Sequence, residues 1–112
     1  MAKTSTHLAN AALQKLQMAG LGQSPDAEDT AKALEKYEAF AAYLSEAEIY
    51  EIADEKDIDL SAFEWLVLYF AYFIASDFSK PQDDAMRQSA EFHLTRMQAS
   101  KPTKERLVVE YF

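Results

Sequence analysis

Residues 65–75 read Trp-Leu-Val-Leu-Tyr-Phe-Ala-Tyr-Phe-Ile-Ala, a helix-length run that carries no charge and has no polar face. A helix that is apolar on every side must be surrounded by other protein. The run is also well short of the roughly 18 apolar residues that cross a membrane. It therefore predicts the central helix of a soluble helical domain, with other helices packed around it and no membrane contact.

The composition limits the remaining possibilities. At 112 residues the chain has the length of one domain, and it contains no cysteine, which excludes disulfides and thiolate chemistry and favours a cytosolic compartment. Residues 1–7 run into an amphipathic pattern, so we expect no secretory signal. The formal net charge of -8 argues against binding to nucleic acids, because that affinity comes from Lys and Arg displacing counterions.

Capping residues and apolar spacing predict two helices in the first half of the chain. The first helix begins after Ser5 or Thr6 and ends at Gly20, with an apolar face of Ala9, Leu13 and Leu16. The second begins at Ser24-Pro25, where a capping hydroxyl precedes proline at the first helical position, and continues to about residue 44. Its expected buried stripe is Ala27, Ala31, Leu34, Tyr37, Ala41 and Leu44, thickened by Phe40 and Tyr43.

Two further helices are expected in the second half. Ser61 and Glu64 have the spacing of a capping box that opens the apolar helix, which should continue to about Asp77. After the break at Pro81, the last helix runs to about Ser100. Its inward positions are Met86, Ala90, His93 or Leu94, and Met97, with Arg87, Glu91 and Arg96 available to solvent.

Residues 45–60 are the least regular stretch. They favour an acidic connection with one short element, which is either a helix opened by Ser45 and Glu48 or an extended segment over residues 48–52. The patterns as a whole predict an all-α fold: a four-helix bundle-like domain over residues 1–100 with a central apolar helix, followed by an extended C-terminal tail over residues 101–112.

Metal chemistry has little support in the sequence. His7 and His93 are far apart and have no ligand partner four residues away, so we expect them to be structural or surface residues. Asp57 and Asp59 begin like a calcium loop, but the sixth position is not glycine and Leu68 replaces the bidentate glutamate.

The sequence also carries no catalytic or nucleotide-binding motif. Gly20 and Gly22 are the two glycines of the chain, and neither opens a phosphate-binding loop. The adjacent acids Asp83 and Asp84 are more typical of helix-dipole partners than of an acid/base pair. We therefore expect no enzyme and no cofactor.

Charge is distributed unevenly along the chain. The middle, residues 26–64, is strongly acidic, whereas the end is locally basic at Arg96, Lys101, Lys104 and Arg106. Such polarity suits head-to-tail packing of identical copies, with Arg96 and Lys101 as candidate subunit contacts. The alternative is that the acids form ordinary solvated helix faces.

Aromatic residues suggest a second contact surface. Tyr69 and Tyr72 are three residues apart, so they share one side of the apolar helix. Their hydroxyl groups are candidate markers of a subunit interface. The alternative is that both tyrosines are buried in the core of their own chain.

The tail is rich in large apolar residues that have no obvious place on the same core. Burying one such side chain is worth about 1.5–3 kcal/mol, so a partner surface would stabilise the segment. We predict that the tail binds another chain by extended pairing or by filling pockets. The alternative is that it packs on its own core. The candidate partner-binding residues are Arg106, Leu107, Val108, Val109, Tyr111 and Phe112.

Three segments resemble the head-tail connector or adaptor proteins of tailed bacteriophages, in particular the tail accessory factor of short-tailed phages. Residues 8–16, Leu-Ala-Asn-Ala-Ala-Leu-Gln-Lys-Leu, are similar to the opening helix of that family. Residues 33–44, Ala-Leu-Glu-Lys-Tyr-Glu-Ala-Phe-Ala-Ala-Tyr-Leu, are similar to its second helix. The apolar helix with the last helix completes a resemblance over roughly residues 5–100. The chain departs from the family in having Ser45-Glu-Ala-Glu-Ile where a glycine turn is common, and in its shorter C-terminal extension.

The resemblance implies a structural virion protein at the head-tail interface, assembled in the host cytoplasm. It implies a ring of identical copies, usually a dodecamer, between the portal protein and the tail or nozzle protein, completing the channel through which genomic DNA passes without specific binding. On this hypothesis the tail, residues 101–112, would contact the portal or a neighbour. The acidic residues Glu48, Glu51 and Asp54 would face the channel and repel phosphates.

Two other functions fit parts of the sequence. The acids of residues 26–64 are compatible with a small acidic inhibitor that mimics DNA and blocks a nucleic-acid enzyme. The apolar tail argues against that alternative, since a monomeric decoy does not need it. A plain helical scaffold or regulatory module is the third possibility.

Overall fold

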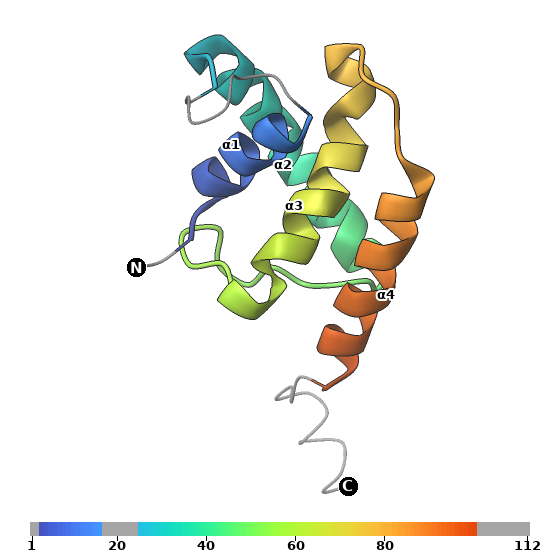
Figure 1. Ribbon diagram of the computed structural model, residues 1–112. Helices are drawn as coiled ribbons and strands as arrows, with labels where there is room; N and C mark the ends of the chain where they lie inside the picture. Colours follow the sequence, from blue (N-terminus) through green and yellow to red (C-terminus); the bar gives the residue numbers. More distant parts are fainter. Residues whose placement is uncertain (1–2, 17–24, 101–112) are drawn as a thin grey trace, which may run out of the picture.

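The computed structural model describes residues 3–16 and 25–100, which form four α-helices and one short 3₁₀ helix (Figure 1). The elements are α1 (Ser5–Lys15), α2 (Ala27–Glu46), α3 (Leu60–Ile74), η1 (Ala75–Phe78) and α4 (Asp84–Ser100). Within these two stretches the β-structure is limited to one isolated bridge between Lys3 and Ile58. The predicted all-α, four-helix bundle-like fold is confirmed, and the predicted tail lies outside the described residues.

The apolar helix α3 is central, as expected. Among the described helices it alone has its backbone close to those of α1, α2 and α4, whereas the backbone of α4 comes close to that of α3 only. The first turn is less covered, because Leu60 is 63% exposed. The buried residues of α3 are Ala62, Phe63, Leu66, Val67, Tyr69, Phe70, Ala71 and Ile74.

Phe40 of α2 occupies the centre of the core. Its ring centroid lies 4.8 Å from that of Phe70 and 5.4 Å from that of Phe73. Stacked and tilted aromatic contacts of this kind add to the free energy gained by burial. The large ring therefore sets which side of α2 faces α3.

This orientation corrects the stripe predicted for α2. The buried residues are Ala33, Tyr37, Phe40 and Leu44, while Ala27 and Ala31 are exposed. Rotating the helix to bury the small alanines would remove Phe40 from the core, and burying a large ring is worth more than burying a methyl group. The prediction gave too much weight to the alanines.

The caps of two helices also differ from the predicted ones. Thr4, not Ser5 or Thr6, caps α1, and it forms a reciprocal capping box in which the His7 amide donates to Thr4 Oγ1 (3.3 Å) and the Thr4 amide donates to His7 Nδ1 (3.0 Å). Asp59, not Ser61, caps α3 by accepting a hydrogen bond from the Ser61 amide (3.2 Å). The negative charge of a carboxylate at this position also interacts favourably with the positive end of the helix dipole, and a hydroxyl group carries no such charge.

Two other predicted boundaries were displaced by a few residues. Asp26 caps α2 by accepting a hydrogen bond from the Glu28 amide, and the helix begins at Ala27. Pro25 therefore precedes the helix. The predicted cap Ser24 and the predicted helix end Gly20 lie outside the described residues. α3 ends at Ile74, and the chain continues as the 3₁₀ helix η1. Ser79, which follows η1, adopts a left-handed backbone (φ 57°).

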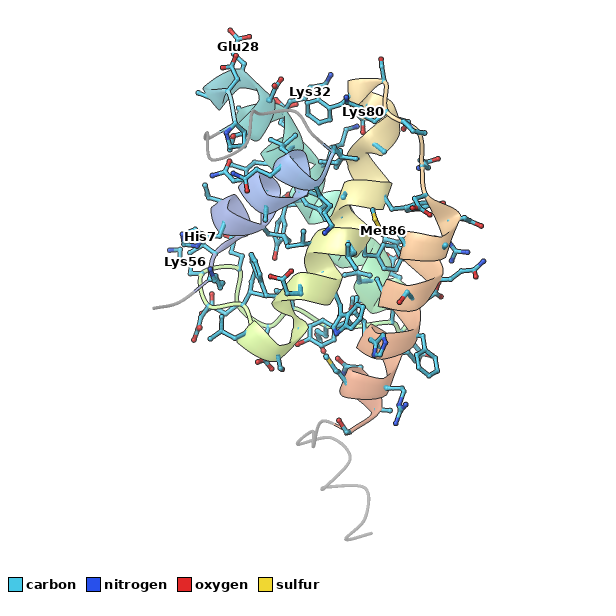
Figure 2. The ribbon with its side chains drawn as sticks, viewed as in Figure 1. His7, Glu28, Lys32, Lys56, Lys80 and Met86 are labelled. Carbon is cyan, nitrogen blue, oxygen red and sulfur yellow. The ribbon has the colours of Figure 1, made fainter. Side chains whose placement is uncertain are left out.

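Polar side chains fasten the end of the bundle where α3 ends and the chain leads into α4. Lys32 of α2 donates to the carbonyl of Asp77 (2.7 Å) and lies 4.8 Å from the ring centroid of Phe78, at the end of the molecule where Figure 2 labels Lys32 and Lys80. At the start of α4, the Gln82 side chain donates to the carbonyl of Tyr72 (3.1 Å). These contacts link η1 to α2 and the lead-in of α4 to α3.

The stretch Leu60–Phe78 is long and apolar enough to satisfy a length-and-composition criterion for a membrane span. Half of its most apolar window is buried inside this bundle. A buried core helix satisfies the same criterion, so the finding does not indicate where the protein resides.

Candidate functional site

The acidic connection between α2 and α3 begins with a backbone turn that normally favours glycine. After α2 ends at Glu46, Glu48 adopts a left-handed conformation with φ 59°. The amides of Ile49 and Tyr50 then donate to the carbonyl of Leu44 (2.9 and 3.4 Å), which satisfies the end of the helix. The Glu48 side chain is consequently exposed at the point where the chain leaves α2.

A groove lies between this turn and the last turns of α4. It has a volume of about 360 Å³, near the lower end of the range of about 300–1,000 Å³ typical of ligand pockets. The side-chain oxygen of Gln98 on α4 accepts a hydrogen bond from the Glu51 amide (2.9 Å) and so fixes one wall against the other. The lining residues are Leu44, Ser45, Glu48, Tyr50, Glu51, Thr95, Gln98 and Ala99.

The third predicted acidic residue lies elsewhere. Asp54 lines a separate hollow of about 200 Å³ beside Asp57 and Asp59, and its carboxylate accepts from the Lys56 amide (2.9 Å). This part of the connection is tied to the start of the chain, because the Ser5 amide donates to the Glu55 carbonyl (2.8 Å). Glu51 lines both hollows, so it lies beside Glu48 in one and beside Asp54 in the other.

The two predicted interface tyrosines have different environments. Tyr69 is only 1% exposed, and its hydroxyl donates to the Tyr43 hydroxyl (3.4 Å), so the alternative of burial in its own core describes this residue. Burial and then the Tyr43 hydrogen bond raise the pKa of Tyr69 above its ordinary value. Tyr72 is half-buried. Of the pair, only Tyr72 retains exposed surface on α3.

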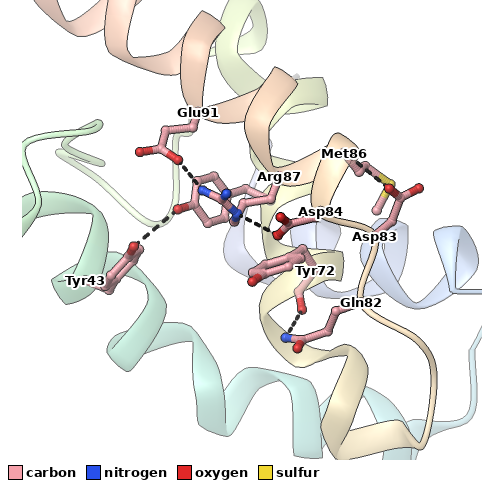
Figure 3. A network of polar contacts seen from close by, with 9 residues as sticks. Tyr43, Tyr72, Gln82, Asp83, Asp84, Met86, Arg87 and Glu91 are labelled. Carbon is pink, nitrogen blue, oxygen red and sulfur yellow. Dashed lines mark hydrogen bonds and ion pairs between the residues drawn. The ribbon is translucent and has the colours of Figure 1, made fainter.

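Arg87 of α4 covers part of that surface (Figure 3). Its guanidinium binds Glu91 (2.6 Å) and Asp84 (3.1 Å) and lies 5.8 Å from the ring centroid of Tyr72. Arg87 and Glu91 are both half-buried, so the prediction that they are available to solvent was only partly correct. Packing the guanidinium over the ring shelters the apolar part of the arginine from water.

A pair of rings joins α3 and α4 further along. The Trp65 and His93 rings are stacked, with centroids 3.9 Å apart and planes 11° from parallel. Of the two inward candidates named for α4, Leu94 is fully buried and His93 is half-buried in this stack. Beside it, Phe92 is 56% exposed and lies under the guanidinium of Arg96 (5.5 Å), the predicted basic contact.

The histidines and carboxylates of the described residues do not gather into a metal site. In residues 3–16 and 25–100, no group of three or more His, Asp or Glu side chains is placed to hold an ion. His7 belongs to the α1 cap and His93 to the Trp65 stack. Each histidine thus has a structural contact within its own chain.

The remaining predicted site residues fall outside the part of the chain that the structure describes. They are Lys101, Arg106, Leu107, Val108, Val109, Tyr111 and Phe112. Sequence reasoning missed the groove, because Gln98 and Glu51 are 47 positions apart and no local pattern connects them.

The chain matches no protein-family model, no curated protein and no solved structure.

Proposed function

We propose that this chain is a structural subunit of a tailed-phage virion, a head-tail connector that forms an oligomeric ring between portal and tail. The observation that carries the proposal is the polarity of one end of the molecule. A groove bearing Glu48 and Glu51 lies beside the end of α4, after which the chain continues into a basic and then an apolar sequence. An acidic surface next to a basic segment suits copies that pack head to tail, because the basic segment of one copy can meet the acidic surface of the next.

The α-helical body supports this role. α4 packs on α3 through the buried Ala90 and Leu94, and its other residues are exposed or half-buried. Two of its outward residues, Phe92 and Arg96, form an exposed aromatic and basic pair. Aromatic and arginine side chains are enriched in protein interfaces.

The tail is proposed to hold the ring to the portal. Its residues 107–112 are mostly apolar, and an apolar segment is stabilised when a partner covers it. Exposed carboxylates such as Asp54 would face the channel, where they would repel DNA phosphates and let the duplex slide.

The test is capture by a portal ring. The full-length chain is mixed with the purified portal protein of the same virus, and the complex is examined by native mass spectrometry and electron microscopy. We expect several copies to dock as a ring on one end of the portal. A variant lacking residues 107–112 is the comparison: it should keep its helical circular dichroism, because the described core is formed by α1–α4, and it should no longer dock. Absence of docking by the full-length chain would refute the proposal.

A DNA-mimicking inhibitor is the second candidate, and one observation favours it. Glu28, Glu35 and Glu46 are exposed and recur on one side of α2 at intervals close to whole helical turns. Such a row of carboxylates could imitate phosphates. The inhibitor function would be favoured over the connector if the chain competes with duplex DNA for a nucleic-acid enzyme, stays monomeric and does not bind the portal.

A further inference from the structure

Two aromatic side chains are open to solvent although most others are covered. Of the Phe, Tyr and Trp side chains that the structure describes, Tyr43 (45%) and Phe92 (56%) are the exposed ones. Tyr43 lies near the end of α2, and Phe92 lies in the second half of α4. Aromatic residues in such positions are common anchors of protein interfaces.

The Phe92 ring is held in place by its neighbours. Its centroid lies 5.3 Å from that of His93, and the Arg96 guanidinium lies 5.5 Å from the Phe92 centroid. His93 is in turn stacked on Trp65 of α3. The exposed ring and the exposed cation are therefore presented together, one helical turn apart, and lose little conformational freedom when a partner binds.

Tyr43 is held in a similar way on the other side of the bundle (Figure 3). Its hydroxyl accepts a hydrogen bond from the Tyr69 hydroxyl (3.4 Å), and its ring centroid lies 6.3 Å from that of the half-buried Phe73. Ala42, beside it, and Glu46, about one turn later, are exposed. These four residues, Ala42, Tyr43, Glu46 and Phe73, form what we call the Tyr43 surface.

The charges around the two exposed rings are opposite. Within residues 85–100, Arg96 is the one charged residue that is exposed. The charged residues of 38–48 are all acidic and all exposed: Glu38, Glu46 and Glu48. Complementary charges of this kind select the partner and fix the register of a contact.

We infer that α4 of one copy docks on α2 of a neighbouring copy, with Phe92 against the Tyr43 surface and Arg96 beside Glu46. This inference rests on the proposed function, because it supplies the contact between successive subunits of the ring. The two surfaces are different and lie on the same chain, so each copy can bind one neighbour through α4 and another through α2. Such a contact generates a ring if the rotation between copies closes.

The order of the residues sets the direction of the contact. Arg96 follows Phe92 by four positions, and Glu46 follows Tyr43 by three. The rings and the charges therefore meet at the same time when the two helices run in the same direction. In Figure 1, α2 and α4 both run from the top of the molecule toward its lower end. A parallel contact thus places successive copies the same way up, as neighbours in a ring are.

The test uses two complementary variants of the full-length chain. The α4 variant, Phe92→Ser/Arg96→Gln, removes the ring and the cation and keeps the Tyr43 surface. The α2 variant, Ala42→Arg/Glu46→Arg, covers the Tyr43 surface with bulk and positive charge and keeps Phe92 and Arg96. All four residues are exposed, so we expect both variants to keep the helical circular dichroism of the wild type.

Each variant has a matched control on exposed residues elsewhere. For the α4 variant it is Lys56→Gln/Leu60→Ser, which also removes one cation and one exposed apolar side chain; Figure 2 labels Lys56, on the side of the molecule away from α4. For the α2 variant it is Ala31→Arg/Glu35→Arg, which makes the same substitutions at the same spacing about three turns, or about 16 Å, earlier on α2.

Association is followed by native mass spectrometry and sedimentation over a range of protein concentrations at one ionic strength. We expect the wild type and both controls to self-associate alike. Each variant should associate at least about tenfold more weakly, because a central aromatic or arginine contact is lost. A mixture of the two variants should form a one-to-one heterodimer, since one intact α4 and one intact Tyr43 surface remain.

A charge exchange tests the register directly. Arg96→Glu and Glu46→Arg should each weaken self-association, because each places like charges opposite one another. Both changes in one chain should recover part of the lost association. A general effect of net charge would not produce this recovery, since the double change leaves the net charge as it is in the wild type.

Four results would each overturn the inference: a wild type that stays monomeric at every concentration, variants that associate like their controls, a mixture without a heterodimer, and a charge exchange without recovery. Portal capture of the wild type is measured separately. If the portal captures the chain while the mixing test fails, the connector function stands without this contact. If the mixing test succeeds and the portal captures nothing, the connector function alone is refuted.

Discussion

The two helices that flank α3 on either side are held by different forces. α1 is short, but Leu8, Ala9, Ala12 and Leu13 are all buried, and the helix packs on both α2 and α3. α4 is longer, yet its fully buried residues are Ala90 and Leu94, and among the described helices its backbone comes close to that of α3 only. α1 is thus fixed by close packing from two sides. α4 packs on α3 through Ala90, Leu94, Met86 and Met97, and ring stacking, a covering arginine and side-chain hydrogen bonds add to this one-sided packing.

This difference has a functional meaning. Close packing resists rearrangement, because interiors have the density of crystals and tolerate few voids. Contacts made by half-buried polar and aromatic side chains are weaker and can be exchanged for contacts with another chain. The proposed assembly surface lies along α4 for this reason, and α1 with α2 serves as the support.

Truncating one buried leucine in α1 and one in α4 tests whether the two helices are held differently. Leu13 and Leu94 are both 0% exposed, so Leu13→Ala and Leu94→Ala are matched changes. Each should lower the free energy of unfolding by about 2–5 kcal/mol, with Leu13 near the upper end because two helices hold the cavity open. Leu94 should lie near the lower end, because α4 can shift toward α3. Urea denaturation measures both values, and an equal or larger loss for Leu94→Ala would contradict the distinction.

Removing the Trp65–His93 stack should loosen α4 alone. His93→Ala should lower the free energy of unfolding by about 1 kcal/mol, the usual worth of a ring pair beyond its burial. Amide exchange should become faster in α4 and stay unchanged in α1. Since Trp65 is the one tryptophan of the chain, its fluorescence reports the loss directly.

The control for this experiment is His93→Phe, which can keep a stacked ring. It should retain most of the stability and the slow exchange of α4. If it behaves like His93→Ala, or if exchange in α1 rises as much as in α4, the stack does not hold α4 as described.

Alkaline pH should act on the opposite, closely packed side of the core. Burial first, and then the charges of Glu55 and Asp54, raise the pKa of Tyr37 from 10.0 to about 12. The folded state therefore holds this proton more tightly than the unfolded state. The resulting stabilisation is complete below pH 10 and is lost as the pH rises toward 12.

Between pH 9 and pH 11 we expect this residue to account for a loss of about 1 kcal/mol in the free energy of unfolding. Tyr37→Phe should flatten that part of the pH dependence while its stability near pH 7 stays close to the wild-type value. Chemical denaturation at the two pH values provides the measurement. An unchanged slope in the variant would show that other groups, such as Tyr69, carry the alkaline effect.

Local sequence patterns predicted the fold well because its strongest signals are local. The charge-free run at residues 65–75 required a surrounded helix, and Pro81 and Asp84 placed the start of α4 within the same turn. The errors came where two local signals competed. Asp59 and Ser61 could each cap α3, and the carboxylate prevailed. On α2 the large ring of Phe40 prevailed over the regular spacing of alanines.

The candidate site was less predictable because its contacts join distant positions. The acidic residues were identified from charge alone, but their distribution over two hollows, with Glu51 lining both, depends on where the connection meets α4 and the start of α1. The Trp65–His93 stack likewise joins two helices whose sequences contain no pairing signal. Periodicity identifies the buried side of a helix, and it does not identify the partner on that side.

The smallest expected effect concerns two residues with left-handed backbones. It distinguishes the conformational cost of Glu48 from the role of its carboxylate in the groove. Glu48 and Ser79 both have left-handed backbones, with φ 59° and 57°, a conformation that costs a residue with a Cβ atom about 1–2 kcal/mol. Glu48→Gly and Ser79→Gly should therefore each raise the free energy of unfolding, by about 0.5 kcal/mol after the greater flexibility of glycine in the unfolded chain is included. Only Glu48→Gly removes a carboxylate from the groove, so it alone should weaken self-association while making the monomer more stable. Denaturant unfolding and sedimentation on the same samples give the two quantities. A loss of stability in Glu48→Gly would mean that this carboxylate supports the fold of its own chain, and that the α4 end is held more firmly than the comparison with α1 indicates.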